Sequence, residues 1–167
     1  MLYFRLILLA LFLFFSSSIL APSHLFAQTT DSPLIGMTAP DAILSKTDGT
    51  SASVLGSRQG GKAILVFWTT WCPHCYENLG IINGSLASIE QKGIKVILVD
   101  LGETQEDVKN YFNRRQMKLI SFIDEDGVLQ RPYHLIGVPT LIFIDEKGII
   151  RSVANEFPSD YENYFSV

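Results

Sequence analysis

Two cysteines, Cys72 and Cys75, are the residues of this 167-residue chain whose type and spacing best suit covalent chemistry. Pro73 and His74 separate them, and the sequence contains no other cysteine. Thiols at this spacing form a reversible disulfide, because so short a loop adds little stability as a structural crosslink. Two cysteines are too few for an all-cysteine zinc site or a disulfide-rich scaffold. The pair therefore predicts thiol–disulfide exchange, with half of a metal site or an inert disulfide as the alternative.

The segments around the pair predict where it lies in the fold. Residues 63–68 (AILVFW) form a continuous apolar run, which is typical of a strand buried on both faces. The helical spacing of apolar residues over 73–91 then predicts a helix. Cys72 would cap this helix, where unpaired backbone N–H groups and the helix dipole stabilise a thiolate. We therefore expect Cys72 to be the nucleophile with an exposed sulfur, and Cys75 to be the more buried resolving thiol.

The neighbours of the two cysteines have predicted roles as well. Pro73 and His74 are both expected to tune the pKa of the Cys72 thiol, and Pro73 also fits the first helical turn, where its missing N–H costs nothing. His74 is expected to lower the pKa of the Cys72 thiol by placing partial positive charge beside the thiolate; the alternative is an exposed polar residue without that effect. Trp68 ends the apolar strand and is expected to pack in the core. Trp71, beside the sulfur, is expected to pack and to contact substrate.

The rest of the sequence predicts a central sheet. A turn signal at Asp48-Gly49 indicates an amino-terminal hairpin. The alternation of strands and helices favours an α/β fold with parallel crossovers and helices on both faces of the sheet. The last two strands are close enough in sequence to form an antiparallel hairpin. The expected strands are 42–44, 51–55, 63–68, 94–99, 119–123, 140–144 and 149–153, and the expected helices are 73–91 and 104–116.

The amino terminus is typical of an export signal. Arg5 precedes the apolar run 6–15, and small residues ending at Ala27 offer a cleavage point. Residues 1–27 are therefore interpreted as an export signal peptide or, if uncleaved, an N-terminal anchor, although the apolar stretch is short for a span of about 20 residues. We expect the remainder to lie outside the cytoplasm, in the periplasm or its equivalent.

The remaining chain has the composition of one folded domain. We interpret residues 28–40, which are rich in Thr, Ser, Pro and Gly, as a linker, and 41–167 as the domain. A hydrophobic content of 47% is too high for a disordered chain. The formal net charge of −4 argues against a nucleic-acid partner, which would need a basic surface.

Residues 36–157 resemble the thioredoxin superfamily and, within it, the exported TlpA-like branch that includes proteins of the ResA and CcmG type. The resemblance implies a thioredoxin-like fold: a central mixed sheet flanked by helices, with an N-terminal hairpin and an inserted strand–helix unit. The matching motifs are Gly36-Met37-Thr38-Ala39-Pro40-Asp41, Val66-Phe67-Trp68-Thr69-Thr70-Trp71-Cys72, Tyr133-x-x-Ile136-Gly137-Val138-Pro139-Thr140 and Phe143-Ile144-Asp145-x-x-Gly148.

This resemblance also implies an activity and a substrate site. It implies a thiol–disulfide oxidoreductase, most often a reductant as in cytochrome c maturation, with no cofactor or metal beyond the disulfide. Pro139 would be a cis-proline facing the dithiol, and the Val138 backbone would pair with an extended substrate peptide. The implied partners are protein thiols and disulfides, apocytochrome c among them, and a membrane thiol-electron carrier as donor.

Three departures from the family pattern bear on proton transfer and on the end of the chain. Thioredoxin has a buried Asp where this sequence has Val66, and TlpA-like proteins usually have Glu where it has Asn78, with Glu77 one position earlier. The proton acceptor for Cys75 is therefore not predicted. After Phe157 only about ten residues remain, so the final helix is expected to be short.

Other functions remain as alternatives. The Pro-His dipeptide resembles that of DsbA, a strong oxidant, so a disulfide-forming oxidant or isomerase is the first alternative. The sequence has no large helical insertion, which favours the reductants. A peroxiredoxin would need a proline where Leu65 stands. A redox-inactive module that binds a peptide or a metal is the alternative from a different class.

Overall fold

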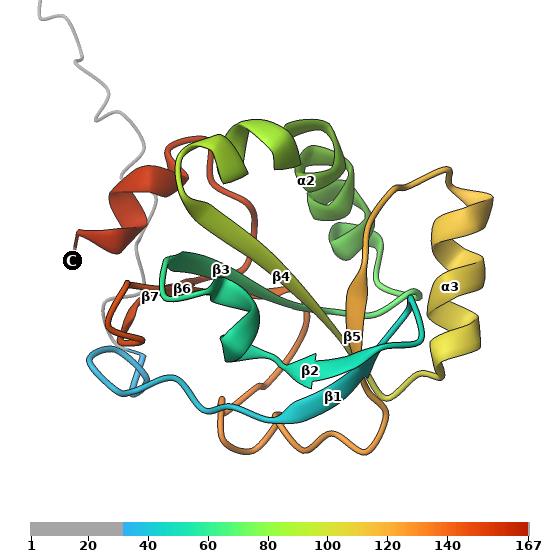
Figure 1. Ribbon diagram of the computed structural model, residues 1–167, viewed down its shortest axis with the longest axis horizontal. Coiled ribbons are helices and arrows are strands. Elements are labelled where there is room, and N and C mark those ends of the chain that lie inside the picture. Colours follow the sequence, from blue (N-terminus) through green and yellow to red (C-terminus); the bar gives the residue numbers. More distant parts are fainter. Residues whose placement is uncertain (1–31, 167) are drawn as a thin grey trace, which may run out of the picture.

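The computed structural model describes residues 32–166, which form one seven-stranded mixed sheet with helices packed against it (Figure 1). The predicted signal peptide or anchor over 1–27 lies outside the described residues. In space the strands follow the order β2-β1-β5-β4-β3-β6-β7. Their bounds are β1 Ile43–Lys46, β2 Ser51–Ser53, β3 Lys62–Trp68, β4 Ile94–Leu101, β5 Ser121–Asp124, β6 Thr140–Ile144 and β7 Ile150–Ala154.

Strand β3 lies inside the sheet, between β4 and β6, and the segment that holds the two cysteines follows its carboxyl end. It pairs in parallel with β4, so that Trp68 lies beside Asp100, and antiparallel with β6. The predicted hairpins β1–β2 and β6–β7 are both antiparallel, as expected. Strand β5 pairs in parallel with β4 and antiparallel with β1. The predicted inserted strand–helix unit therefore places β5 between the N-terminal hairpin and the parallel core.

The structure has two α-helices: α2 follows strand β3, and α3 follows strand β4. Helix α2 (Pro73–Gln91) is capped by Cys72 and ends before Gly93, whose φ of 75° needs a residue without a side chain. Helix α3 (Gln105–Arg114) begins after Thr104, whose hydroxyl accepts a hydrogen bond from the Asp107 N–H at 3.2 Å. The 3₁₀ helices are η1 (Leu55–Arg58) and η2 (Tyr161–Phe165), and η2 is the short final helix that the sequence predicts.

Helices lie on both faces of the sheet, as expected, but both α-helices pack on one face and the other carries the 3₁₀ helix η1. Alternate side chains of β3 divide the interior into two cores. One core holds Val66 and Trp68 together with side chains of α2, α3 and η2. The other holds Leu65 and Phe67 and is covered by η1, residues 34–39 and the loop 129–135. Large apolar side chains in these irregular segments bury the second face of the sheet in place of a layer of α-helices.

Part of the predicted linker belongs to the packed domain. Leu34 and Ala39 are 3% and 5% exposed and lie in the second core. The Tyr133 hydroxyl donates to the Pro40 carbonyl at 2.7 Å, and its ring lies 5.0 Å from that of Phe67. The domain therefore begins to pack before Asp41, where the sequence places its start. Within residues 32–166, no helix is long and apolar enough to cross a membrane.

Candidate active site

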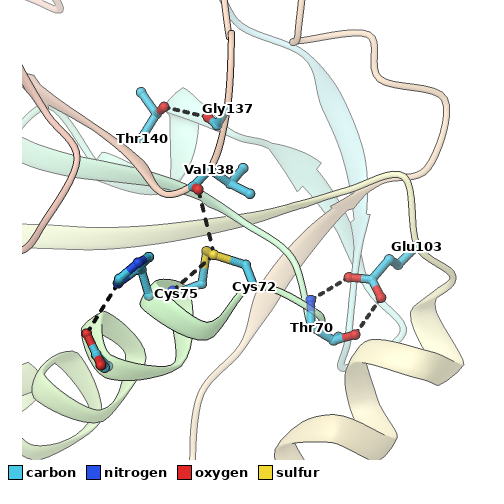
Figure 2. Close-up of a disulfide and its surroundings, with 9 residues drawn as sticks. Thr70, Cys72, Cys75, Glu103, Gly137, Val138 and Thr140 are labelled. Carbon is cyan, nitrogen blue, oxygen red and sulfur yellow. Dashed lines mark hydrogen bonds and ion pairs between the residues drawn. A yellow bond between two sulfur atoms is a disulfide. The ribbon is translucent and has the colours of Figure 1, made fainter.

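Cys72 and Cys75 form a disulfide at the junction between β3 and α2 (Figure 2). Their Cα atoms are 5.2 Å apart, and Cys72 occupies the N-cap position of α2 that the sequence predicts. The Cys75 N–H donates to the Cys72 Sγ at 3.1 Å. An unpaired N–H of the first helical turn is thus directed at the sulfur, as is needed to stabilise a thiolate there.

The two cysteine residues differ in exposure in the expected order, and both are buried. Cys72 is 5% exposed and Cys75 is 0% exposed. In this oxidised state Cys72 is therefore largely covered as a residue. The cause is the loop before β6, because the Val138 carbonyl oxygen lies 3.6 Å from the Cys72 Sγ. A substrate that reaches this sulfur must meet Val138 as well.

The loop over the disulfide has the conformation that the family resemblance implies. The Val138–Pro139 peptide bond is cis. The Thr140 hydroxyl donates to the Gly137 carbonyl at 2.8 Å, which fixes the loop where it enters β6. Figure 2 shows the Val138 carbonyl pointing toward Cys72. The structure thus brings Val138, and with it the cis bond to Pro139, beside Cys72.

The two tryptophans of the motif are in different environments. Trp68 is fully buried, its Nε1 donates to the Ser121 hydroxyl at 3.0 Å, and its ring stacks on Phe112 at 5.1 Å. It packs in the core, as predicted. Trp71 is 71% exposed, and Ile136, in the loop that leads to Val138, is fully exposed. Both side chains are therefore available to another molecule.

His74 faces a carboxylate in the structure. Its Nδ1 lies 3.6 Å from the Glu77 Oε2, and both side chains are mostly exposed. Glu77 and the solvent therefore offset part of any positive charge that His74 presents to Cys72. The spacing of three residues along a helix was the signal for this pair in the sequence.

We expect His74→Ala to make the reduction potential of the cysteine pair more negative, by less than about 30 mV. This bound corresponds to one pKa unit of the thiol, about 1.4 kcal/mol, in a two-electron couple. Glu77→Gln, the matched variant, should shift the potential the opposite way because it releases the imidazole from its carboxylate. A glutathione redox titration measures both. An unchanged or less negative potential in His74→Ala would make His74 a bystander.

The two positions that depart from the family pattern hold no acid, and both are buried. Val66 lies in the core at 1% exposure. The Asn78 Oδ1 accepts a hydrogen bond from the Phe157 N–H at 2.8 Å, so this side chain fastens the carboxyl-terminal segment to α2. Asn78 therefore has a structural role at the position where the family resemblance implies Glu.

Two acids that the sequence analysis missed lie beside the active-site segment. Glu103 accepts hydrogen bonds from the Thr70 N–H and the Thr70 hydroxyl, each at 2.6 Å (Figure 2). Asp100 is fully buried near the end of β4, and burial, together with the neighbouring Glu103, raises the pKa of its carboxyl to about 9. Asp100 is therefore protonated at neutral pH. A carboxyl at the end of the otherwise apolar run 96–101 was the only signal for it in the sequence.

Across residues 32–166, no group of three or more His, Cys, Asp and Glu side chains could hold a metal ion.

A disulfide at the start of a helix, after an interior strand of a mixed sheet and under a cis-proline loop, defines a thioredoxin-like protein. The model of the AhpC/TSA family matches residues 35–153. The chain belongs to this family and, within it, to the TlpA-like thiol–disulfide oxidoreductases of the ResA type, as the sequence motifs predict.

Curated relatives and solved structures agree with this placement. The chain is 30% identical over 123 residues to "Thiol-disulfide oxidoreductase ResA" of Bacillus thuringiensis subsp. konkukian, covering 73% of this chain and 70% of the relative. It is 30% identical over 115 residues to "Sporulation thiol-disulfide oxidoreductase A" of Bacillus subtilis, covering 66% and 68%.

Among solved structures, a putative thiol:disulfide interchange protein DsbE from Chlorobium tepidum superposes with a TM-score of 0.69 at 26% identity, over 79% of this chain and 95% of that one. StoA from Bacillus subtilis superposes with a TM-score of 0.64 at 23% identity, over 77% and 98%. The predicted fold class and the predicted thiol–disulfide oxidoreductase activity are thus confirmed.

Proposed function

We propose that this chain is an extracytoplasmic reductant of protein disulfides that works through Cys72 and Cys75. The observation that carries the proposal is the asymmetry of the pair. Cys72 caps α2 with an N–H directed at its sulfur, while Cys75 is fully buried behind it. This arrangement supports attack by the first cysteine and release by the second.

The proposed reaction transfers two electrons from the dithiol to a substrate disulfide. The Cys72 thiolate attacks one substrate sulfur, the substrate S–S bond breaks, and the departing sulfur takes up a proton. The Cys75 thiol then releases its proton to water and attacks the Cys72 Sγ. This second step breaks the mixed disulfide and frees the other substrate sulfur, which is protonated in turn. The substrate ends as two thiols and the protein as the Cys72–Cys75 disulfide.

The substrate contacts that we propose lie around the loop over the sulfur. An extended peptide would pair with the Val138 backbone beside Pro139, and Trp71 would cover its side chains. The 71% exposure of Trp71 and the position of the Val138 carbonyl, 3.6 Å from the Cys72 Sγ, support this path. Backbone pairing accepts many sequences, which suits a protein that reduces several substrates.

The proposed location, electron donor and substrate are argued from the sequence. The apolar run 6–15 behind Arg5 supports export, which would place the pair in an oxidising compartment. There, a dithiol stays reduced only if a membrane thiol-electron carrier recharges it. By its resemblance to the TlpA-like branch, we propose apocytochrome c as one substrate.

The test is a redox titration combined with an assay of insulin disulfide reduction. For the reductant, we expect a potential closer to the value of about −270 mV for thioredoxin than to about −120 mV for DsbA. We also expect turnover with dithiothreitol as the electron source, and none from the double variant Cys72→Ser/Cys75→Ser. A potential near that of DsbA would reverse the proposed direction of electron flow. A lack of turnover by the wild-type protein would favour a redox-inactive binding module.

A further inference from the structure

We propose that Glu103 is a positioning residue for Cys72 and that its negative charge makes the cysteine pair more reducing, with Asp100 as its neutral partner. The inference deepens the reductant role proposed above and rests on it. Nothing in the motif around the cysteines identifies either acid, because both come from the end of β4 and the loop that follows it.

Glu103 holds the active-site segment through two short hydrogen bonds, which we call the Thr70–Glu103 clamp. Both carboxylate oxygens are used, one by the Thr70 N–H and one by the Thr70 hydroxyl, each at 2.6 Å. The backbone next to Glu103 is fixed on both sides, because Gly102 donates to the Asp124 carbonyl at 3.0 Å and Thr104 caps α3. A charged acceptor with two donors is among the stronger hydrogen-bonded arrangements in proteins.

The clamp acts on the turn that delivers the nucleophile. Thr70 lies two residues before Cys72, and the Cys72 N–H donates to the Thr69 carbonyl across a turn, at 3.5 Å. Thr70 cannot shift without displacing this turn. The clamp therefore sets where the Cys72 sulfur lies relative to Val138.

Asp100 is the buried acid that lies next to Glu103. Side chains alternate along a strand, and Leu98 faces the core that holds Cys75, so Asp100 faces that core too. Its carboxyl is fully buried, and neither of its oxygens has a hydrogen-bond donor within residues 32–166. The adjacent polar group is Glu103, itself an acid. Two carboxyl groups can share a hydrogen bond only when one is protonated, so the pair carries a single negative charge.

The more buried acid keeps the proton. Burial, with Glu103 and Asp107 nearby, raises the pKa of Asp100, so the charge resides on the half-buried Glu103. From α3, Tyr111 also faces this pair, and burial raises the pKa of its hydroxyl. Arg115 is the cation on this side, with its guanidinium 4.7 Å from the Tyr111 ring.

From α2, Tyr76 faces the same group of side chains, with its ring 4.2 Å from the Arg115 guanidinium. His74, also on α2, lies in the exposed first turn and faces Glu77. These side chains contribute to the electrostatic environment of Glu103, and none of them is changed in the variants below.

A carboxylate in this place favours the disulfide over the dithiol. Two residues of chain span at most about 7 Å, so the Glu103 charge lies on the order of 10 Å from the Cys72 sulfur. A negative charge at that range disfavours a thiolate, which exists only in the reduced form. His74 would act the other way, but it is mostly exposed and faces Glu77, whereas Glu103 is half-buried and less screened. The balance explains how a Pro-His dipeptide can belong to a reductant.

The experiment compares Glu103→Gln with Glu146→Gln in the full-length protein. Glu146 lies in the β6–β7 turn, at the opposite end of the sheet from the disulfide, so its variant makes the same change in charge far from Cys72. We expect Glu103→Gln to lower the Cys72 thiol pKa, followed by thiolate absorbance against pH. We also expect its equilibrium constant with glutathione to move toward the dithiol by about threefold to tenfold, where tenfold equals about 30 mV. Glu146→Gln should change neither quantity.

Two further variants separate position from charge. Thr70→Val removes one bond of the clamp and leaves the charge, so the rate of exchange with a substrate disulfide should fall severalfold while the equilibrium constant moves less than in Glu103→Gln. Asp100→Asn keeps a neutral donor to Glu103 and should retain the wild-type equilibrium constant.

The inference is overturned if Glu103→Gln leaves the equilibrium constant unchanged or moves it toward the disulfide. It is also overturned if Asp100→Asn shifts the constant as far as Glu103→Gln. The wild-type potential is a separate readout. A value near that of DsbA would overturn the reductant direction while leaving the sign of the Glu103 effect intact.

Discussion

Cys75→Ser should turn this protein into a trap that accumulates mixed disulfides with its substrates, whereas Cys72→Ser should trap almost nothing. Cys72 carries the sulfur at which the Cys75 N–H is directed, at 3.1 Å, and it retains some exposure. Cys75 is fully buried and can resolve a mixed disulfide but not begin one. Either variant should lose at least about two orders of magnitude in reductase turnover, because each removes one of the two covalent steps.

Non-reducing electrophoresis followed by mass spectrometry measures the trapped species. Reduced variants are incubated with insulin or with an extract of the exported proteins, and the adducts are released with dithiothreitol. The double variant Cys72→Ser/Cys75→Ser controls for noncovalent association. Equal trapping by the two single variants would mean that the exposure of the cysteines does not determine their roles.

The local part of the site could be predicted from the sequence because it depends on neighbouring residues. An apolar strand, a proline in the first helical turn and the spacing of two cysteines determine where Cys72 lies relative to α2. The hairpin at Asp48-Gly49 and the antiparallel pair β6–β7 were predicted for the same reason. Each depends on a turn of a few residues, and the strand pairing confirms both.

The cover of the sheet could not be predicted in this way. Tyr133 and Leu34 lie in segments without helical or strand periodicity, yet each is almost fully buried against the second core. Their burial depends on contacts between distant parts of the chain, such as the bond from the Tyr133 hydroxyl to Pro40. A pattern of spacings within one segment carries no information on such contacts.

The acids beside the site were missed for a related reason. The family pattern directs attention to Val66 and Asn78, and neither position can take up a proton in this chain. The acid that the structure does place near the pair is on the next strand, where the register sets Asp100 beside Trp68. That register is a long-range property, and it brings Glu103 to Thr70 across 33 residues of sequence.

Asp100 should make the stability of the folded protein fall as the pH rises through neutrality. In the unfolded chain its carboxyl ionises near its ordinary pKa of 3.8, whereas in the folded protein burial raises that pKa to about 9. Between these values the unfolded state releases a proton that the folded state keeps. The contribution of Asp100 is therefore fully present below about pH 4 and is lost progressively up to about pH 9. The slope is about 1.4 kcal/mol per pH unit.

The carboxyl groups with lowered pKa values affect the free energy of unfolding only at acidic pH. The pKa of Asp48 is lowered, mainly by hydrogen bonds from Thr50, and that of Asp145 is lowered by hydrogen bonds from Ile149, Arg151 and Lys147, which outweigh its burial. Groups of this kind contribute stability above their unfolded pKa and lose it as the pH falls through the lower folded value. Their effect is confined to acidic pH, so the range from about pH 5 to about pH 8 reports mainly on Asp100.

The comparison is urea unfolding of the oxidised wild type and of Asp100→Asn across this range, because every other titratable group is common to both proteins. The amide cannot ionise, so the variant should lack the downward slope. Its free energy of unfolding relative to wild type should rise by about 4 kcal/mol from pH 5 to pH 8. Parallel curves for the two proteins would mean that Asp100 is already ionised in the folded state. Glu103 would then face a second negative charge, and the single-charge pair proposed beside the active site could not exist.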